Sequence, residues 1–182
     1  LSLRRQRQMC IRDRSYTKQM STSSLPAKLE TKMYYYRGMI YLDFMMMGAM
    51  DKEVLTQVES IGEDALNKAA FGSLKKCIEL DIKNQSKSDI TRKVDGLRGM
   101  AINGGVKLFQ DGDYNNAFEA FKGAVLMYDV ISIPDTLAMV NAALAAEKMK
   151  SYDNAYTYYK MCVDNNYGKG AEMYQSMIRV LN

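Results

Sequence analysis

The chain has 182 residues, 47% of them hydrophobic, with 25 Lys and Arg against 21 Asp and Glu and no His. This length is sufficient for one domain with a sizeable core. Without His, Cys-x-x-Cys pairs or a Gly-rich phosphate loop, the sequence lacks the residues of a zinc site, a Ser/His or Cys/His pair and a nucleotide site, so we expect no enzyme, cofactor or metal.

The excess positive charge lies at the start of the chain. Residues 1–14 contain five Arg and one Asp, so residues 15–182 carry 20 charges of each sign and are neutral. Residues 8–14, Gln-Met-Cys-Ile-Arg-Asp-Arg, resemble a translated sequencing adapter and follow an Arg-Gln stutter, so we interpret residues 1–14 as an artefact; a genuine basic arm is the alternative. The neutral remainder gives no reason to predict binding of nucleic acid or of an anionic membrane.

The same features indicate an internal fragment of a longer protein, since the chain begins with Leu1 instead of Met. A signal peptide would lie upstream of such a fragment, so both a cytoplasmic and a periplasmic location stay open. The apolar run considered as a membrane span, residues 44–47, is far short of the roughly 20 residues that span a bilayer, and no other run approaches that length. We expect no membrane insertion.

Beyond a Ser-, Thr- and Lys-rich lead-in that ends near residue 28, helical spacing of apolar residues dominates the sequence. We expect a disordered or artefactual segment over 1–28 and a helical domain over 29–182. The expected helices cover residues 28–47, 51–59, 65–81, 90–110, 114–128, 135–149, 152–165 and 171–181. No segment alternates like a strand for long, so the sequence predicts an all-α fold.

One residue pattern occurs twice, beginning at Gly105 and again at Ala143. The first copy comprises Gly105, Leu108, Gly112, Tyr114, Ala117, Phe121 and Ala124. The second comprises Ala143, Ala146, Tyr152, Ala155, Tyr159 and Cys162. Small residues allow two helices to cross closely and aromatic rings fill the gap against the next pair, so the pattern predicts antiparallel helical hairpins. Cys77 and Cys162 fall at small positions, where we expect buried hydrophobic residues instead of a disulfide.

A looser copy precedes these two and a partial one follows. Gly38 and Tyr41 match the first helix of a hairpin, Ala70, Leu74 and Cys77 match its second helix, and Ala171 with Tyr174 begins another. This arrangement resembles the tetratricopeptide repeat (TPR) of bacterial proteins. It differs from the TPR pattern in lacking Trp, in having Ile82 where a closing Pro would stand, and in its longer spacing. The resemblance implies a TPR-like α-solenoid of about three repeats, over 31–82, 88–129 and 134–167, plus a truncated fourth over 169–182.

In TPR proteins the first helix of each pair lines a concave groove. Carried over to this sequence, the groove residues are Tyr35, Met39, Ile102, Val106, Val140, Leu144, Gln175 and Arg179. This row is largely apolar, so the resemblance implies a scaffold or adaptor that binds a peptide or helix of a partner protein. The alternative for the row is packing against further repeats or within a tight solenoid. A carboxylate-binding groove is not expected, because Ile102 and Val106 stand where basic or polar residues would be needed.

A second interpretation is a structural or self-associating subunit of a larger envelope or secretion assembly. The Met-rich segment 44–50 favours it, because flexible thioether side chains suit adaptable interfaces. The alternative is that these methionines pack under the first hairpin, as part of an insertion over 43–64.

Overall fold

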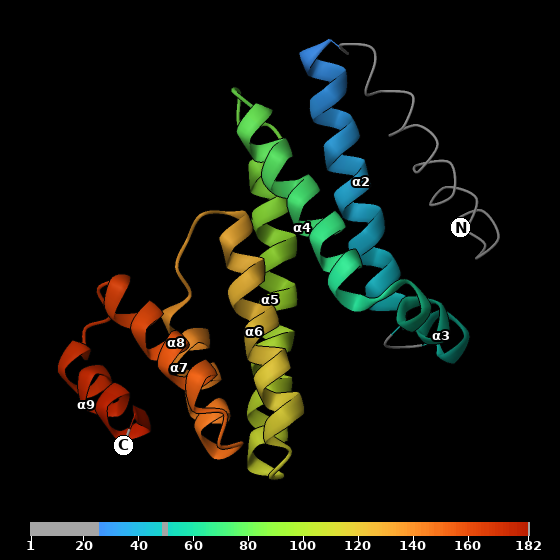
Figure 1. The fold of residues 1–182 in the computed structure, drawn as a ribbon. Helices are drawn as coiled ribbons and strands as arrows, with labels where there is room; N and C mark the ends of the chain where they lie inside the picture. The colour runs from blue at the N-terminus through green and yellow to red at the C-terminus, as the bar shows by residue number, and fades with distance from the viewer. Residues whose placement is uncertain (1–25, 49–50, 182) are drawn as a thin grey trace. The chain divides into compact units, whose positions relative to one another are not determined.

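The computed structural model describes residues 26–48 and 51–181, which form helices joined by turns and contain no strand. The described helices are α2 (Ala27–Gly48), α3 (Lys52–Ile61), α4 (Glu63–Leu80), α5 (Lys87–Gln110), α6 (Tyr114–Val130), α7 (Thr136–Lys148), α8 (Tyr152–Asp164) and α9 (Gly170–Leu181) (Figure 1). The predicted all-α fold is confirmed for this part of the chain. The suspected adapter segment 1–14 and most of the predicted lead-in lie outside the described residues.

The chain divides into two compact units, Leu1–Lys87 and Ser88–Asn182. In the first unit α2 packs along α4, and α3 contacts both helices. A Cβ atom added to Gly38 would lie 2.5 Å from Leu74 Cδ2 and 3.1 Å from the Ala70 carbonyl oxygen, so the glycine allows α2 and α4 to approach. Ala70, Leu74 and Cys77 are fully buried. The small residues expected between the two helices therefore lie in their interface.

The Met-rich end of α2 belongs to a small core beneath α3. Phe44, Val54, Val58 and Leu66 form a buried cluster, and the side chains of Met45 and Met47 pack against it together with Tyr41. Asp51 caps α3, because its carboxylate accepts hydrogen bonds from the backbone N–H groups of Glu53 and Val54. The described part of the predicted insertion over 43–64 is thus mostly helical. Met45 and Met47, from the Met-rich segment that was one candidate for an interface, pack in this core.

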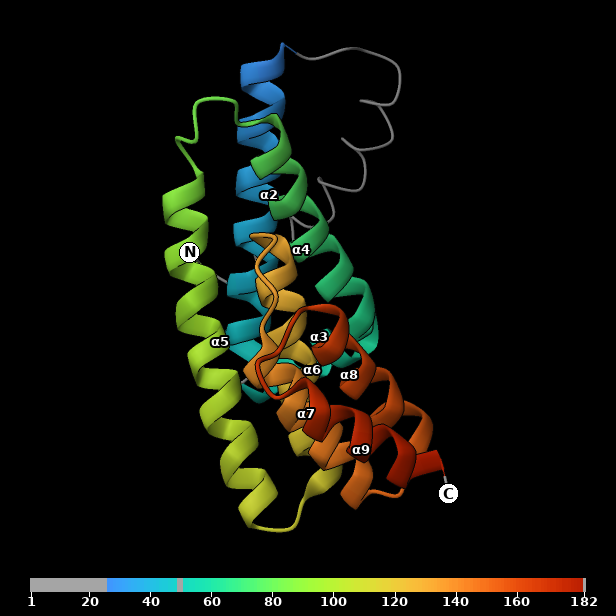
Figure 2. The ribbon, with the colours of Figure 1, turned by 90° about the vertical axis from the view of Figure 1, so that its left-hand side faces the viewer.

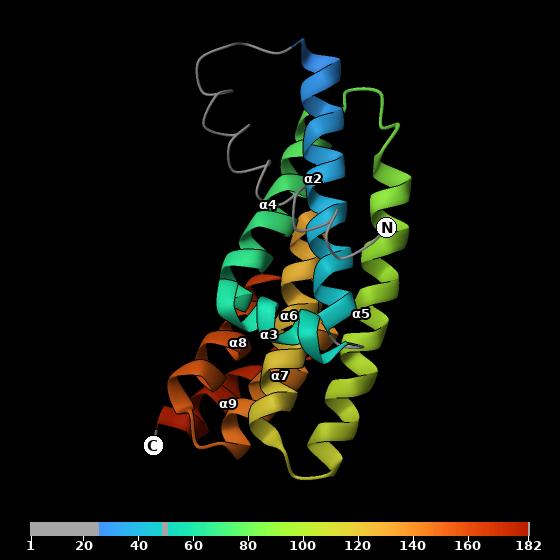
Figure 3. The same ribbon diagram turned by 90° about the vertical axis from the view of Figure 1, so that its right-hand side faces the viewer.

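In the second unit the helices pack in sequence order. Contacts join α6 to α7, α7 to α8 and α8 to α9, and α7 lies between α5 and α9 (Figures 2 and 3). The helices α5 and α6 meet at Gly105, where an added Cβ atom would lie 2.7 Å from the Phe121 ring. Ala117 and Phe121 share one buried core with Ala155 and Tyr159, their equivalents in the next hairpin. These packed helix pairs are consistent with a helical repeat.

The turn inside each hairpin of this unit has the same backbone geometry. Gly112 and Lys150 have φ angles of 83° and 61°, in the left-handed region. After each of them the next residue donates a backbone hydrogen bond of 2.9 Å back into the preceding helix, from Asp113 to the Leu108 carbonyl and from Ser151 to the Ala146 carbonyl. Such bonds satisfy the last carbonyls of a helix and reverse the chain.

The connections that leave α6 and α8 also match each other, but with a shorter spacing along the chain. Ser132 and Asn166 have φ angles of 57° and 55°. The residue after each donates to a carbonyl in the preceding helix, from Ile133 to Tyr128 at 3.1 Å and from Tyr167 to Cys162 at 3.0 Å. The interval from Ser132 to Asn166 separates the connection before α7 from the connection before α9, and it is shorter than the interval from Gly112 to Lys150, which separates the α5–α6 turn from the α7–α8 turn.

Candidate partner-binding surface

Two of the predicted groove residues belong to the first unit. Tyr35 and Met39 are half-buried on α2. The Tyr35 ring meets the Tyr36 ring edge to face, with 5.3 Å between their centroids. The remaining predicted residues lie in the second unit and are described there.

On α5 and α7 the predicted residues fall into two classes. Ile102 and Val140 are half-buried and pack against the core of the second unit. Val106 and Leu144, one turn later in each helix, are 39% and 40% exposed. Packing accounts for the first pair, whereas the second pair presents apolar surface to solvent.

On α9 the structural register singles out different residues from those chosen by sequence. The interval from Ser132 to Asn166, applied to α7, makes Tyr174 and Ile178 the equivalents of Val140 and Leu144. Tyr174 is 55% exposed and Ile178 is 62% exposed. Gln175, one position further along, is exposed as well. The sequence signal for this register is the spacing between Ser132 and Asn166, which is shorter than the spacing between Gly112 and Lys150.

We refer to the resulting set as the first-helix row. It consists of Ile102 and Val106 on α5, Val140 and Leu144 on α7, and Tyr174 and Ile178 on α9. A polar residue follows the first member on each helix, and all three carry a carboxamide: Asn103, Asn141 and Gln175. A carboxamide both donates and accepts hydrogen bonds, as a peptide backbone requires of its partner.

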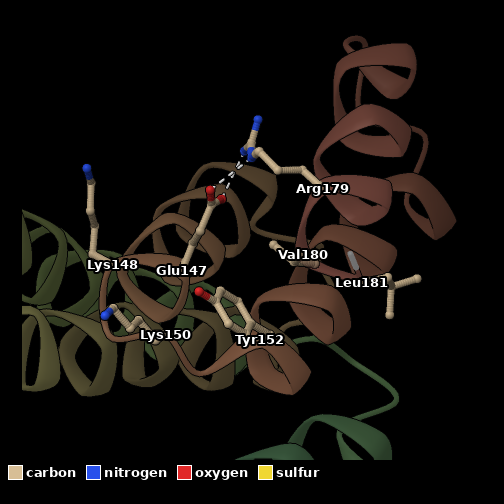
Figure 4. A pocket seen from close by; sticks show the side chains of 7 residues that line it. All are labelled: Glu147, Lys148, Lys150, Tyr152, Arg179, Val180 and Leu181. Carbon is tan, nitrogen blue, oxygen red and sulfur yellow. Dashed lines mark hydrogen bonds and ion pairs between the residues drawn. The ribbon is translucent and has the colours of Figure 1, made fainter.

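Arg179, the last predicted groove residue, is engaged within the unit. Its guanidinium donates two hydrogen bonds of 2.9 Å to the Glu147 carboxylate (Figure 4). The same carboxylate also accepts a 2.8 Å bond from the Tyr159 hydroxyl. The bonds from Arg179 hold the pKa of Glu147 below its ordinary value. Burial, together with the bond to Glu147, raises the pKa of Tyr159 to about 12. This network joins α7, α8 and α9.

A pocket of about 620 Å³ lies beside this network, between the α7–α8 turn and the end of α9. Its lining consists of Glu147, Lys148, Lys150, Tyr152, Arg179, Val180 and Leu181 (Figure 4). Lys148 and Lys150 are exposed, and no ion pair joins either side chain to another described residue. Within the described chain, the pocket therefore combines apolar wall, one tyrosine ring and two lysines outside any ion pair.

The pocket occurs where the two hairpins differ in sequence. At the α5–α6 turn the rings of Phe109 and Tyr114 pack edge to face, with centroids 5.1 Å apart. The equivalent residues at the α7–α8 turn are Glu147 and Tyr152. Glu147 binds Arg179 instead of a ring, and Tyr152 is 49% exposed. Because no second ring packs against it at this turn, the Tyr152 ring is exposed beside the pocket.

A second ionic network stabilises the unit away from the first-helix row. Arg98 donates to both carboxylate oxygens of Asp135, one of them at 2.9 Å, and its guanidinium lies 4.6 Å from the centre of the Tyr128 ring. The Asp135 side chain is only 2% exposed, and it caps α7 by accepting from the Ala138 N–H. We assign this network a structural role.

The two cysteines in the described part of the chain are buried, as expected for small positions between helices. Cys77 and Cys162 are free thiols with no exposed surface. Burial raises the pKa of both, to about 11 for Cys162. Among the described residues no group of three His, Cys, Asp or Glu side chains is placed to hold a metal ion, and no described helix is long and apolar enough to cross a bilayer.

The comparisons with known proteins give no family assignment. No protein-family model matches the sequence, and no curated protein matches it either.

Proposed function

We propose that the helices are TPR-like repeats and that the chain is a protein–protein interaction scaffold without catalytic activity of its own. In this proposal the first-helix row lies on the concave face of the array and binds a peptide or a helix of a partner protein. The two repeat intervals, the glycine contact with Phe121 and the matching turns support this assignment of the repeats.

One observation supports the binding role most strongly. The same position on three successive first helices carries an apolar side chain that is partly exposed: Val106 at 39%, Leu144 at 40% and Ile178 at 62%. A row of apolar side chains flanked by carboxamides suits a segment that buries apolar residues and hydrogen-bonds through its backbone. Scattered exposed apolar residues are ordinary on protein surfaces, but repetition at equivalent positions is a property of binding faces in repeat arrays.

The test compares two leucines of equal exposure. Peptides that bind the full chain are selected from a displayed random library, and their dissociation constants are measured for the wild type and for two variants. Leu144→Glu places a charge in the first-helix row, whereas Leu126→Glu places one on α6, where Leu126 is 41% exposed. We expect Leu144→Glu to weaken binding about tenfold or more, as for loss of a central interface residue. Equal affinities for both variants would contradict the proposed surface.

Self-association is the second candidate, and the exposed face of α9 favours it. Tyr174, Ile178 and Leu181 are 55%, 62% and 69% exposed along one side of this helix. An apolar helix face of this kind can pair with a second copy. Light scattering after size-exclusion chromatography decides the matter: a dimer that Ile178→Glu converts to a monomer supports this candidate, and a monomer at high concentration rejects it.

A further inference from the structure

The first-helix row leads along α7 and α9 to the pocket at their ends. Val140, Leu144 and Lys148 follow each other at intervals of four residues, so they share one face of α7. On α9, Ile178 is followed one turn later by Leu181, which lines the pocket. The residue of α5 equivalent to Lys148 is Gln110, which carries no charge. A lysine therefore follows the apolar residues of this face at the end of α7, whereas the last turn of α5 carries its lysine three positions earlier, at Lys107.

The positive charge of the pocket comes from its two lysines. Arg179 and Glu147 neutralise each other through two hydrogen bonds, whereas no carboxylate among the described residues forms an ion pair with Lys148 or Lys150. Val180, Leu181 and Tyr152 supply apolar and aromatic surface beside these charges (Figure 4). An anionic ligand with an apolar side chain matches both features.

The backbone at Lys150 fixes the position of this residue at the α7–α8 turn. Lys150 occupies the left-handed region with a φ of 61°, at the turn position where the preceding hairpin has Gly112. Glycine adopts this conformation without steric penalty, whereas lysine does not. The same left-handed conformation closes the connections at Ser132 and Asn166, so it is the geometry of the turn that places Lys150 beside the pocket.

We propose that the pocket binds the acidic end of the partner segment, with carboxylates at Lys148 and Lys150 and an apolar side chain against Tyr152, Val180 and Leu181. This inference rests on the proposed function and specifies the chemistry of the partner: an acidic peptide whose neighbouring apolar residues lie along the first-helix row.

The library selection described above provides the test, with the full chain as the target. We expect the selected peptides to contain Asp or Glu next to apolar residues. A labelled peptide of the selected sequence should bind about tenfold more tightly than its analogue with Asn and Gln in place of the acids, and added salt should reduce this preference. The double variant Lys148→Glu/Lys150→Glu should lose the preference. Lys107→Glu is the matched control, because Lys107 also lies in the last turn of a first helix.

A second variant separates binding from folding. Lys150→Gly places glycine at the left-handed turn, so it should raise the melting temperature while it weakens binding of the acidic peptide severalfold. Peptides without acidic enrichment, or a preference that survives in the double variant, would overturn the inference while leaving the role of Leu144 intact. Selection of no peptide at all would contradict both this inference and the proposed function.

Discussion

Two adjacent glycines of α5 differ in what surrounds them. A Cβ atom at Gly105 would lie 2.7 Å from the Phe121 ring, whereas a Cβ atom at Gly104 would meet nothing within 4 Å. A rigid ring in a packed core has little room to move, so Gly105→Ala should lower the free energy of unfolding by about 1–3 kcal/mol. Chemical denaturation monitored by circular dichroism measures the change.

The matched control for this prediction is the neighbouring residue. Gly104→Ala introduces the same methyl group into the same helix without a clash, and it should raise the free energy of unfolding by roughly 0.5–1 kcal/mol. If both variants changed the free energy of unfolding in the same direction, α5 and α6 would not approach each other closely at Gly105.

The Tyr159 hydroxyl makes stability depend on pH at the alkaline end. Its pKa is raised in the folded state from the ordinary 10.0 to about 12. A raised pKa stabilises the fold below the ordinary value, and this contribution is lost as the pH rises from 10 towards 12. Tyr159→Phe should therefore flatten the decline in unfolding free energy over that range, and should lower stability at pH 7 by about 1 kcal/mol through loss of the bond to Glu147.

The Glu147 carboxylate acts at the acidic end of the pH range. Its pKa is lowered by Arg179, so its contribution to stability is present above the ordinary pKa of Glu and is lost as the pH falls through the folded-state pKa. Tyr159→Phe should leave most of this acid-side loss in place, since Arg179 is its main cause. Denaturation curves of the wild type and of Tyr159→Phe, measured from pH 3 to pH 12, test both expectations. If the unfolding free energy of the two proteins fell equally between pH 10 and pH 12, the role given to Tyr159 would be refuted.

Residue identity was enough to predict the buried positions but not the polar networks. Gly105, Ala117 and Cys162 could be placed between helices because small residues at helical spacing have few other roles. The bond from Arg98 to Asp135 joins residues far apart in the chain. Periodicity contains no information on such distant side-chain pairs, so this bond could not be predicted. For the same reason, the repeat pattern predicts Arg179 as a groove residue and contains no sign of its bond to Glu147.

At the scale of helices and turns, the ion pair between Arg98 and Asp135 connects α5 to the start of α7. Arg98→Met would leave the Asp135 carboxylate, 2% exposed, without its guanidinium partner. We expect the unfolding free energy to fall by about 3 kcal/mol, as for other buried pairs that lose one member. In the Arg98→Met variant, Asp135→Asn should lower the unfolding free energy by less than it does in the wild type. If the losses of the two single variants simply added in the double variant, the two side chains would not interact directly.

An exposed ion pair serves as the control. Lys160 and Asp164 interact at 2.6 Å on α8, with side chains 54% and 55% exposed. Lys160→Met should leave stability nearly unchanged, because solvent screens such pairs. A loss as large as that of Arg98→Met would show that burial is not the cause of the difference.

The helix boundaries followed from local chemistry, but the repeat register did not. Each described helix begins and ends close to its predicted bounds, since Asp113 and Asp135 are strong capping residues. The register of α9 depends on the connection through Ser132 and Asn166, whose spacing is shorter than that of the turn through Gly112 and Lys150. A non-glycine residue in the left-handed conformation is not recognisable from its side chain, so the interval of the turn residues on either side of α7 and α8 could not be predicted from the sequence.

For the whole molecule, the net charge is a property of one short segment. Residues 1–14 account for the entire net charge of +4. Deletion of these residues should abolish retention on heparin at low salt, because electrostatic attraction to a polyanion needs excess positive charge. Deletion of residues 15–25, which contain a single Lys and no acid, should change the elution only slightly. Retention that survives removal of residues 1–14 would indicate a basic surface elsewhere in the chain.

Glu147 stands at a position where the preceding hairpin has an aromatic residue, so the two hairpins differ in sequence beside the pocket. Replacing Glu147 by Phe would reproduce the ring pair of the preceding hairpin, fill the space beside Tyr152 and release Arg179. A chain redesigned towards identical hairpins would then be better packed, yet it would lose the pocket that we propose as the site for the acidic end of a ligand. Consensus redesign of this chain should therefore leave position 147 untouched.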